Sequence, residues 1–468
     1  MEEDVLYQGY GTHYVDLYVG TPPQRQTVIV DTGSSVTAFP CMDCVNCGDS
    51  YHVDPYFQEE ESVTFVDVPC DDCFLGTCLA STPLCEVSVS YQEGSSWRAY
   101  EVEDIVHAGG TLDDAMAMSK QDDSDDADTD NGDTDVRKVA SSSSTDYDGL
   151  NPLSKHAAFS MHFGCQTHLT GLFKTQLADG IMGMEMANSS FWKQMHDSAP
   201  EKPQVFSMCF THESSASKEG NPAGIMNFGG TNPELLHSTP MVFAEQKNNE
   251  GWYTVRIQAI YLRTNGGLSV EEGKGDALLP DAEYDLATNG PDMAEYTKID
   301  STPAAINNGE VIVDSGTTDT YLNAKMATAF KKAWSEVTGR KYEHEAWELT
   351  EEELLNLPTI VFQLRGVPED NDDPTAPGLA AELDSNNPTD ILVAMPPTHY
   401  MEYSMEDKTF KSRVYLNEMH GGVLGANFML GHDILFDMDN NRLGFAESDC
   451  NYLRVAAEMD QHDGGAGM

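Results

Sequence analysis

The feature that most constrains this chain is a pair of matching segments that lie far apart in the sequence. An apolar run near the start ends in the motif Asp31–Ser34, and a later apolar run ends in the motif Asp314–Thr317. Each motif is followed, more than a hundred residues later, by two apolar residues and a glycine, at Ile181–Gly183 and Val423–Gly425. Two copies of the same pair of signals indicate that the chain is built from two related halves.

Both motifs have the residue types needed to hold a carboxyl group at a tight turn. An apolar strand delivers Asp31 or Asp314 to its end, and a Thr or Ser follows whose hydroxyl can tie the two turns together. The next glycine lets the backbone turn sharply and lets neighbouring groups approach closely. A second hydroxyl, from Ser34 or Thr317, can donate to the carboxylate. The supporting residues predicted by the motifs are Thr32, Gly33, Ser34, Ser315, Gly316 and Thr317.

If the two halves pack symmetrically, Asp31 and Asp314 face each other. Two adjacent carboxyl groups do not both ionise easily, so they share one proton and titrate as a pair. Such a pair can draw a proton from a bound water, which then attacks a peptide carbonyl, and no metal, cofactor or covalent intermediate is required. A single Asp-Thr-Gly is equally consistent with a plain turn after a strand. Two copies with the same downstream signal favour a catalytic pair.

The charge balance excludes several classes of partner. The 468 residues include 26 basic and 78 acidic ones, which gives a net charge of -52. Such a chain repels nucleic acids and anionic lipid surfaces, so we expect no nucleic-acid partner. No apolar run of about 18 residues is present, so no transmembrane segment is expected. The first residues are acidic and lack the apolar core of a secretory signal, and we expect any leader, propeptide or C-terminal anchor to be missing from this chain.

Short apolar runs separated by glycine and proline predict a β-rich chain with few helices. Strands are expected at 14–19 and 26–30, and the best helix candidate is Ala324–Val337. The predicted organisation has an N-terminal lobe at 1–204, a C-terminal lobe at 205–455 and a flexible tail at 456–468. The predicted insertions are a cysteine-rich segment at 41–85, a disordered acidic segment at 111–150, and acidic loops at 266–308 and 366–390.

These segments resemble the pepsin-like aspartic endopeptidases over nearly the whole chain outside the acidic insertions. The resemblance implies an all-β, bilobal pepsin-like fold with pseudo-twofold symmetry and few short helices. It also implies a monomer with Asp31 and Asp314 as catalytic residues and a long cleft for extended polypeptide substrates. The segments that carry the resemblance are Tyr18–Gln24, Asp31–Ser35, Asp179–Gly183, Trp252–Val255, Asp314–Thr318, Leu357–Phe362, Val423–Gly425 and Phe445–Ala446.

The same resemblance identifies a candidate flap, a β-hairpin that closes over substrate. Tyr91 matches the flap tyrosine of the family and is followed by Glu93 and Gly94; an ordinary hairpin tyrosine is the alternative. Many members have a tryptophan shortly after the first motif that hydrogen-bonds this tyrosine. Here Ala38 falls at that position, so we expect the flap to be steadied by another group or to be more mobile.

Glu93 suggests a substrate preference. In the plasmepsin V branch an acidic flap residue helps to bind a basic substrate side chain, and Glu93 matches its place. The resemblance therefore implies an Arg or Lys a few residues before the cut, whereas the alternative is a solvated hairpin glutamate. That branch usually has a cysteine where Gln92 stands, so the chain departs from its pattern there.

Seven of the ten cysteines lie between residues 41 and 85. Their spacing is compatible with a zinc site, but a cysteine-rich insert at this place resembles the nepenthesin-like and plasmepsin V branches and favours disulfides. Seven is odd, so one of these cysteines is free or pairs outside the cluster, for example with Cys165, Cys209 or Cys450. Sequence does not decide the pairing. The disulfide candidates are Cys41, Cys44, Cys47, Cys70, Cys73, Cys78, Cys85, Cys165, Cys209 and Cys450.

Disulfides predict an oxidising compartment: the lumen of the endoplasmic reticulum, a vacuole-like compartment or the outside of the cell. Asn188 begins an N-glycosylation triplet, which would suit such a location. Two further classes of function remain open: a catalytically silent peptide-binding or inhibitor protein on the same fold, and a metal-binding protein based on the cysteines. Silent relatives usually lose an aspartate or a motif, and both motifs are intact here.

Overall fold

The computed structural model describes residues 2–78, 83–108, 158–211, 220–247, 250–264, 295–452 and 454. The predicted disordered insertion at 111–150 and the predicted tail at 456–468 lie outside the described residues. The described part is mostly β-sheet, as predicted. None of its helices is both long and apolar enough to cross a membrane.

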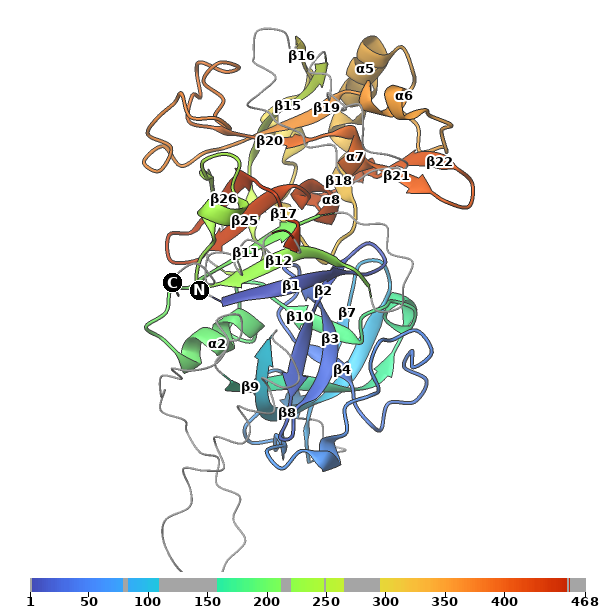
Figure 1. The fold of residues 1–468 in the computed structure, drawn as a ribbon, viewed down its shortest axis with the longest axis vertical. Coiled ribbons are helices and arrows are strands. Elements are labelled where there is room, and N and C mark those ends of the chain that lie inside the picture. Colours follow the sequence, from blue (N-terminus) through green and yellow to red (C-terminus); the bar gives the residue numbers. More distant parts are fainter. Residues whose placement is uncertain are drawn as a thin grey trace, which may run out of the picture.

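One sheet of 15 strands runs through both halves of the chain. At its centre, the N-terminal strand β1 pairs with β12 from the second half, so the halves are joined by backbone hydrogen bonds (Figure 1). The strands of the first half are β1 (Glu2–Gln8), β2 (His13–Val19), β3 (Gln24–Asp31), β4 (Ala38–Pro40), β5 (Val66–Asp67), β6 (Thr77–Cys78), β7 (Cys85–Ser90), β8 (Ser96–Ala108), β9 (Phe159–Leu169) and β10 (Gly180–Gly183). Those of the second half are β11 (Val205–Phe210), β12 (Pro222–Phe228), β13 (Val242–Glu245), β25 (His432–Asp437) and β26 (Arg442–Glu447).

Three smaller sheets complete the second half, which occupies the upper part of Figure 1. The first contains β14 (Thr254–Val255), β17 (Val311–Val313), β18 (Thr320–Asn323), β23 (Val414–Glu418) and β24 (Gly422–Leu424). The second contains β15 (Ile257–Thr264), β16 (Glu295–Lys298), β19 (Thr359–Leu364) and β20 (Ile391–Met395), and the third pairs β21 (Met401–Ser404) with β22 (Thr409–Ser412).

The helices are few and mostly short. The α-helices are α2 (Phe191–Ser198), α3 (Pro233–Leu236), α4 (Pro303–Ile306), α5 (Ala327–Thr338), α6 (Glu351–Leu355), α7 (Pro397–Tyr400) and α8 (Ala426–Met429). The 3₁₀ helices are η1 (Glu59–Glu61), η2 (Gly171–Lys174) and η4 (Ala324–Met326). Together η4 and α5 confirm the helix predicted at 324–337, and β2 and β3 confirm the two predicted strands.

The loop predicted at 266–308 is corrected in its described part. Residues 295–298 form β16, which pairs with β15, and residues 303–306 form α4. The start of α4 is stabilised by Pro303 in its first turn and by the Thr302 side chain, which accepts from the Ala305 N–H. The acidic composition of the segment did not indicate this helix. Residues 265–294 lie outside the described part, and residues 366–390 contain no named helix or strand.

The strand order around the two motifs is the same in both halves. In the first half β10 lies between β3, its parallel partner, and β4, its antiparallel partner. In the second half β24 lies in the same way between β17 and β18. The apolar-apolar-glycine segments are thus the strands that pack beside the two motif strands. Because these strands are buried on both faces, they are continuous apolar runs rather than alternating ones.

All ten cysteines are paired, so the disulfide prediction is confirmed. Cys41 is the member of the cluster that pairs outside it, with Cys165 on β9. Because every cysteine is paired, the structure favours disulfides over the alternative of a zinc site made of thiolates. The five bonds are Cys41–Cys165, Cys44–Cys47, Cys70–Cys78, Cys73–Cys85 and Cys209–Cys450.

A buried carboxylate anchors the cysteine-rich insert. Glu101 on β8 is fully buried and accepts hydrogen bonds from the Phe74 N–H at 2.9 Å and the Gly76 N–H at 3.0 Å. His162 Nδ1 lies 2.9 Å from the same carboxylate. Burial opposes ionisation, but the bonds from His162 and from the backbone N–H groups outweigh it and lower the pKa of Glu101. The insert is therefore held by one ionised side chain as well as by disulfides.

We predict that Glu101→Gln lowers the free energy of unfolding at neutral pH by about 2–4 kcal/mol. The amide oxygen is a weaker acceptor than the carboxylate, and the amide NH₂ would face N–H groups that can only donate. Since the pKa is lowered in the folded protein, this stabilisation is present above the unfolded pKa and is lost as the pH falls through the folded one. Denaturant unfolding at neutral and strongly acidic pH measures it, with the exposed Glu60→Gln as control. An equal loss at both pH values would contradict the prediction.

Candidate active site

The two motif aspartates occupy equivalent places in the two halves. Asp31 is the last residue of β3 and is paired in register with Gly183 of β10. Asp314 directly follows β17, and its N–H donates to the Leu424 carbonyl at 3.0 Å. The exposed fractions of the two residues are 4% for Asp31 and 8% for Asp314. Both carboxyl groups therefore lie at the ends of buried strands with little access to solvent.

Reciprocal hydrogen bonds lock the two motif turns together. The Thr32 N–H donates to the Ser315 hydroxyl at 3.1 Å, and the Ser315 N–H donates to the Thr32 hydroxyl at 3.0 Å. Each hydroxyl then donates across to the other half, Thr32 to the Val313 carbonyl at 2.9 Å and Ser315 to the Val30 carbonyl at 2.7 Å. All four groups are buried, so each half satisfies the polar groups of the other.

The motif glycines provide space for the opposite aspartate. A Cβ placed on Gly33 would stand 2.8 Å from Asp314 Oδ1, which is too close for a real contact. A Cβ on Gly316 would overlap Asp31 Oδ1. Neither glycine is among those with positive φ, so space and not backbone conformation excludes a side chain. Each carboxylate lies over the glycine of the other motif, which brings the two carboxylates face to face.

Each carboxylate receives the same pair of donors. Asp31 accepts from the N–H of the glycine two residues on at 2.9 Å and from the Ser34 hydroxyl at 2.5 Å. Asp314 accepts from its own glycine N–H at 2.9 Å and from the Thr317 hydroxyl at 2.6 Å. The structure thus brings together all eight residues that the motifs predicted.

Burial raises the pKa of Asp31 well above its usual range, and the neighbouring charge of Asp314 raises it further. The Ser34 hydroxyl and the Gly33 N–H favour the ionised form but do not cancel this rise. A hydrogen bond between the two carboxyl groups adds to it. The pair therefore keeps one proton at pH values where an exposed carboxyl has lost it.

Tyr91 lies at the turn of the hairpin formed by β7 and β8. The turn is closed by bonds from the Tyr91 N–H to Ser95 O at 2.9 Å and from the Gly94 N–H to Tyr91 O at 3.1 Å. Its ring packs on Phe173, with centroids 5.1 Å apart. Burial, and next the charge of Asp31, raise the pKa of Tyr91. Glu93 is exposed on the same turn.

Trp97 is a residue of this site that sequence reasoning missed. Its indole Nε1–H donates to the Tyr91 hydroxyl at 3.2 Å, and its ring is buried beside Ala38 in a small apolar core. The tryptophan expected after the first motif is thus absent, and a tryptophan from the hairpin itself supplies the bond. The available signal was an aromatic residue six positions after Tyr91, on the returning strand of the hairpin.

Trp252 lies on the other side of the site. The sequence places it at the start of a strand, but its side chain extends to the first motif, where Nε1–H donates to the Gly33 carbonyl at 3.1 Å. Its exposed fraction is 40%, whereas the next residue, Tyr253, is fully buried. A large exposed indole therefore lies beside the residues that hold the aspartates.

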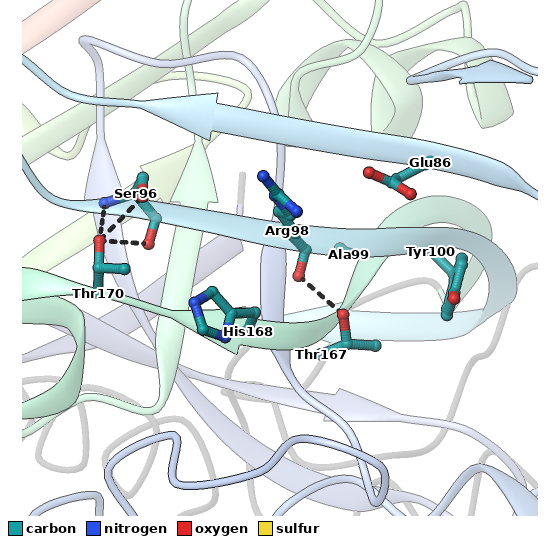
Figure 2. A pocket seen from close by; sticks show the side chains of 8 residues that line it. All are labelled: Glu86, Ser96, Arg98, Ala99, Tyr100, Thr167, His168 and Thr170. Atoms are coloured by element: carbon teal, nitrogen blue, oxygen red, sulfur yellow. Dashed lines mark hydrogen bonds between the residues drawn. The ribbon is translucent and has the colours of Figure 1, made fainter. Parts of the chain in front are cut away.

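A separate concavity of about 520 Å³ lies on the outer face of the hairpin (Figure 2). Arg98 of β8 and His168 of β9 are paired in register there, and Ser96 and Thr170 hydrogen-bond at its end. These residues alternate along the strand with buried Trp97, so the concavity opens away from Tyr91 and the aspartates. Its lining comprises Glu86, Ser96, Arg98, Ala99, Tyr100, Thr167, His168 and Thr170.

Comparisons with known proteins agree with this geometry. A profile described as "Xylanase inhibitor N-terminal" matches residues 13–122 and 115–230. "Plasmepsin V" of Plasmodium falciparum is 21% identical, in a match that covers 94% of this chain and 72% of that protein. "Aspartyl protease family protein 2" of Arabidopsis thaliana is 23% identical over 95% of this chain and 72% of that protein.

The chain is similar over most of its length to proteins of the pepsin-like aspartic protease group, which are peptide hydrolases. "Aspartic protease 5" of Toxoplasma gondii is 28% identical over 49% of this chain, but the match covers only 21% of that protein. The matched half of this chain thus corresponds to about a fifth of that relative. Asn188 of this pepsin-like chain is exposed just before α2, and its glycosylation stays a prediction.

For this protease we predict that Trp97→Phe lowers kcat/KM for a peptide substrate about threefold to tenfold, because the Tyr91 hydroxyl loses its donor while the aromatic packing is kept. A double-mutant cycle with Tyr91→Phe, read by steady-state cleavage, measures the coupling. Adding Tyr91→Phe to Trp97→Phe should cost less than it does in the wild type. Fully additive losses would show that the bond does not position the tyrosine.

Proposed function

We propose that this chain is an aspartic endopeptidase that hydrolyses peptide bonds of extended polypeptides with a water molecule activated between Asp31 and Asp314. The observation that carries the proposal is the crossed packing of each carboxylate on the glycine of the other motif. This packing leaves two carboxyl groups face to face and one proton shared between them. A site of this kind has both an acid and a base within reach of one water molecule.

The reaction uses the two carboxyl groups in opposite roles. The ionised carboxylate takes a proton from the water, whose oxygen attacks the carbonyl carbon of the substrate. The protonated carboxyl of the pair gives its proton to the carbonyl oxygen, forming a tetrahedral diol. The carboxyl that took the water proton then gives it to the amide nitrogen, and the C–N bond breaks. One diol hydroxyl returns its proton to the other carboxylate, which restores the pair as an acid and an amine leave. General acid–base help of this kind contributes typically ~10²–10⁴ in rate.

The substrate proposal concerns extended polypeptides in an oxidising compartment. The hairpin that carries Tyr91 would close over the peptide, and five disulfides suit a secretory or lumenal location. Glu93 is exposed on the hairpin turn, which supports a preference for Arg or Lys a few residues before the cut.

A catalytically silent peptide-binding or inhibitor protein is the second candidate. It is favoured by the description of the matching profile, which names an inhibitor. Against it, both aspartates are present and each keeps a hydroxyl and an N–H donor. A silent relative has no need of this arrangement of donors.

The test is cleavage of unstructured peptides across acidic to neutral pH, with and without a pepstatin-type inhibitor. Asp31→Asn should lower kcat by about 10²–10⁴ because it removes one of the two carboxyl groups that exchange protons with the water and the substrate. Activity should fall as the pH rises through the raised pKa of Asp31, since the shared proton is then lost. The exposed Asp197→Asn is the matched control. Equal cleavage by the wild type and Asp31→Asn would exclude this mechanism and favour the silent alternative.

We further predict that Glu93→Gln removes the preference for a basic residue before the cut, lowering kcat/KM for the Arg peptide about threefold to tenfold relative to its citrulline counterpart. A cleavage-site profile of a peptide library measures this preference. A wild-type profile that is indifferent to basic residues before the cut would remove the proposed role of Glu93.

A further inference from the structure

An isolated β-bridge joins the two halves beside the aspartates. The Met186 N–H donates to the Gly251 carbonyl at 3.0 Å, and the Gly251 N–H donates to the Met186 carbonyl at 2.9 Å. The bridge is antiparallel, so the residues next to it, Glu185 and Trp252, are opposite each other. Glu185 from the first half therefore lies beside Gly251 and Trp252 from the second half, next to the motif residues.

Trp252 offers a flat apolar surface at this point. Its indole is held by the bond from Nε1–H to the Gly33 carbonyl, and 40% of the residue is exposed. Gly33 in turn lies against the Asp314 carboxylate. The indole is therefore next to Gly33, which lies against one of the two proposed catalytic carboxylates.

Glu185 offers a carboxylate at the same point. Its N–H donates to the Ser34 carbonyl at 2.9 Å, which ties it to the first motif. Its Oε1 lies 3.3 Å from the position that a Cβ on Gly251 would occupy, so the glycine leaves one flank of the carboxylate open. Glu185 is partly buried, and burial raises its pKa. Among the described residues, the carboxylate has no hydrogen-bond or ion-pair partner.

We propose that Glu185 and Trp252 form a subsite that binds a cationic side chain of the substrate, Arg in preference to Lys. This proposal rests on the proposed endopeptidase function and adds a second specificity position to it. A half-buried carboxylate without a counter-ion is unfavourable, and a substrate cation would supply one. A guanidinium can stack on the indole face while its N–H groups donate to the carboxylate, which an ammonium does less well.

This subsite is distinct from the one proposed for Glu93. Glu93 lies on the turn of the β7–β8 hairpin, whereas Glu185 follows β10 and contacts the segment before Trp252 from the second half. A peptide bound across the aspartates would meet the two acids at different positions. The structure thus assigns two basic positions to the substrate, each governed by its own carboxylate.

The experiment uses a series of uncleavable peptides in which a reduced bond replaces the scissile amide. Each peptide carries either Arg or its neutral isostere citrulline at a single position. The series moves this position through the four residues on either side of the reduced bond. Calorimetry on the wild-type chain should find one position, other than that controlled by Glu93, where Arg binds about tenfold more tightly than citrulline. Because binding is measured, the result does not depend on hydrolysis.

Three variants distinguish a binding role from a structural one. Glu185→Gln should bring the ratio of Arg to citrulline affinity at that position close to one, and Glu185→Lys should reverse it so that a Glu peptide binds better than the Arg peptide. Glu336→Gln, an exposed carboxylate on α5, should leave the ratio unchanged. Trp252→Leu should reduce the advantage of Arg over Lys, because stacking is lost.

The proposal is overturned if no second position favours Arg, or if the ratio is the same in Glu185→Gln and wild type. Failure of the endopeptidase function gives a different result: the intact-bond peptides stay uncleaved while the affinity ratios are still measurable. Cleavage without any dependence on Glu185 would instead leave the endopeptidase proposal standing and remove only this subsite.

Discussion

The reciprocal bonds between Thr32 and Ser315 are the interaction on which the rest of the site depends. They join residues that are 283 positions apart in the chain, and every group in them is buried. A buried hydroxyl or N–H without a partner is costly, so neither half can bury its motif turn at low cost without the other. The site therefore exists only when both halves are folded and docked, and the shared sheet through β1 and β12 holds them in register.

This docking brings together two groups that repel each other when charged. The cost is limited by the donors around them, a hydroxyl and a glycine N–H for each carboxylate, and by the proton that the pair retains. Burial alone would raise the pKa of one isolated aspartate, but only the second carboxylate makes the two groups differ in role. The chemistry proposed here is thus a property of the interface between the halves and not of either motif.

Several side chains around the two aspartates are particular to this chain. Trp97 donates to Tyr91 from within the hairpin, so the hairpin and its tyrosine form one unit with the small core around Ala38. Trp252 connects the second half to the Gly33 carbonyl. The net charge of -52 does not identify the acidic residues that matter at the site. The position and burial of each carboxylate do. Glu101 stabilises the cysteine-rich insert, whereas Glu185 and Glu93 remain accessible to a ligand.

The sequence by itself determined the two aspartates, their hydroxyl and glycine neighbours, the β-rich class of the fold and the presence of disulfides. These follow from residue types at short spacing, such as an apolar run that ends in Asp-Thr-Gly, and short spacing is what local sequence encodes. Only the tertiary structure decided that Cys41 pairs with Cys165, that Trp252 donates to the Gly33 carbonyl, and that Glu185 lies beside Gly251. Each of these contacts joins segments whose approach depends on how whole strands pack, and no local pattern carries that information.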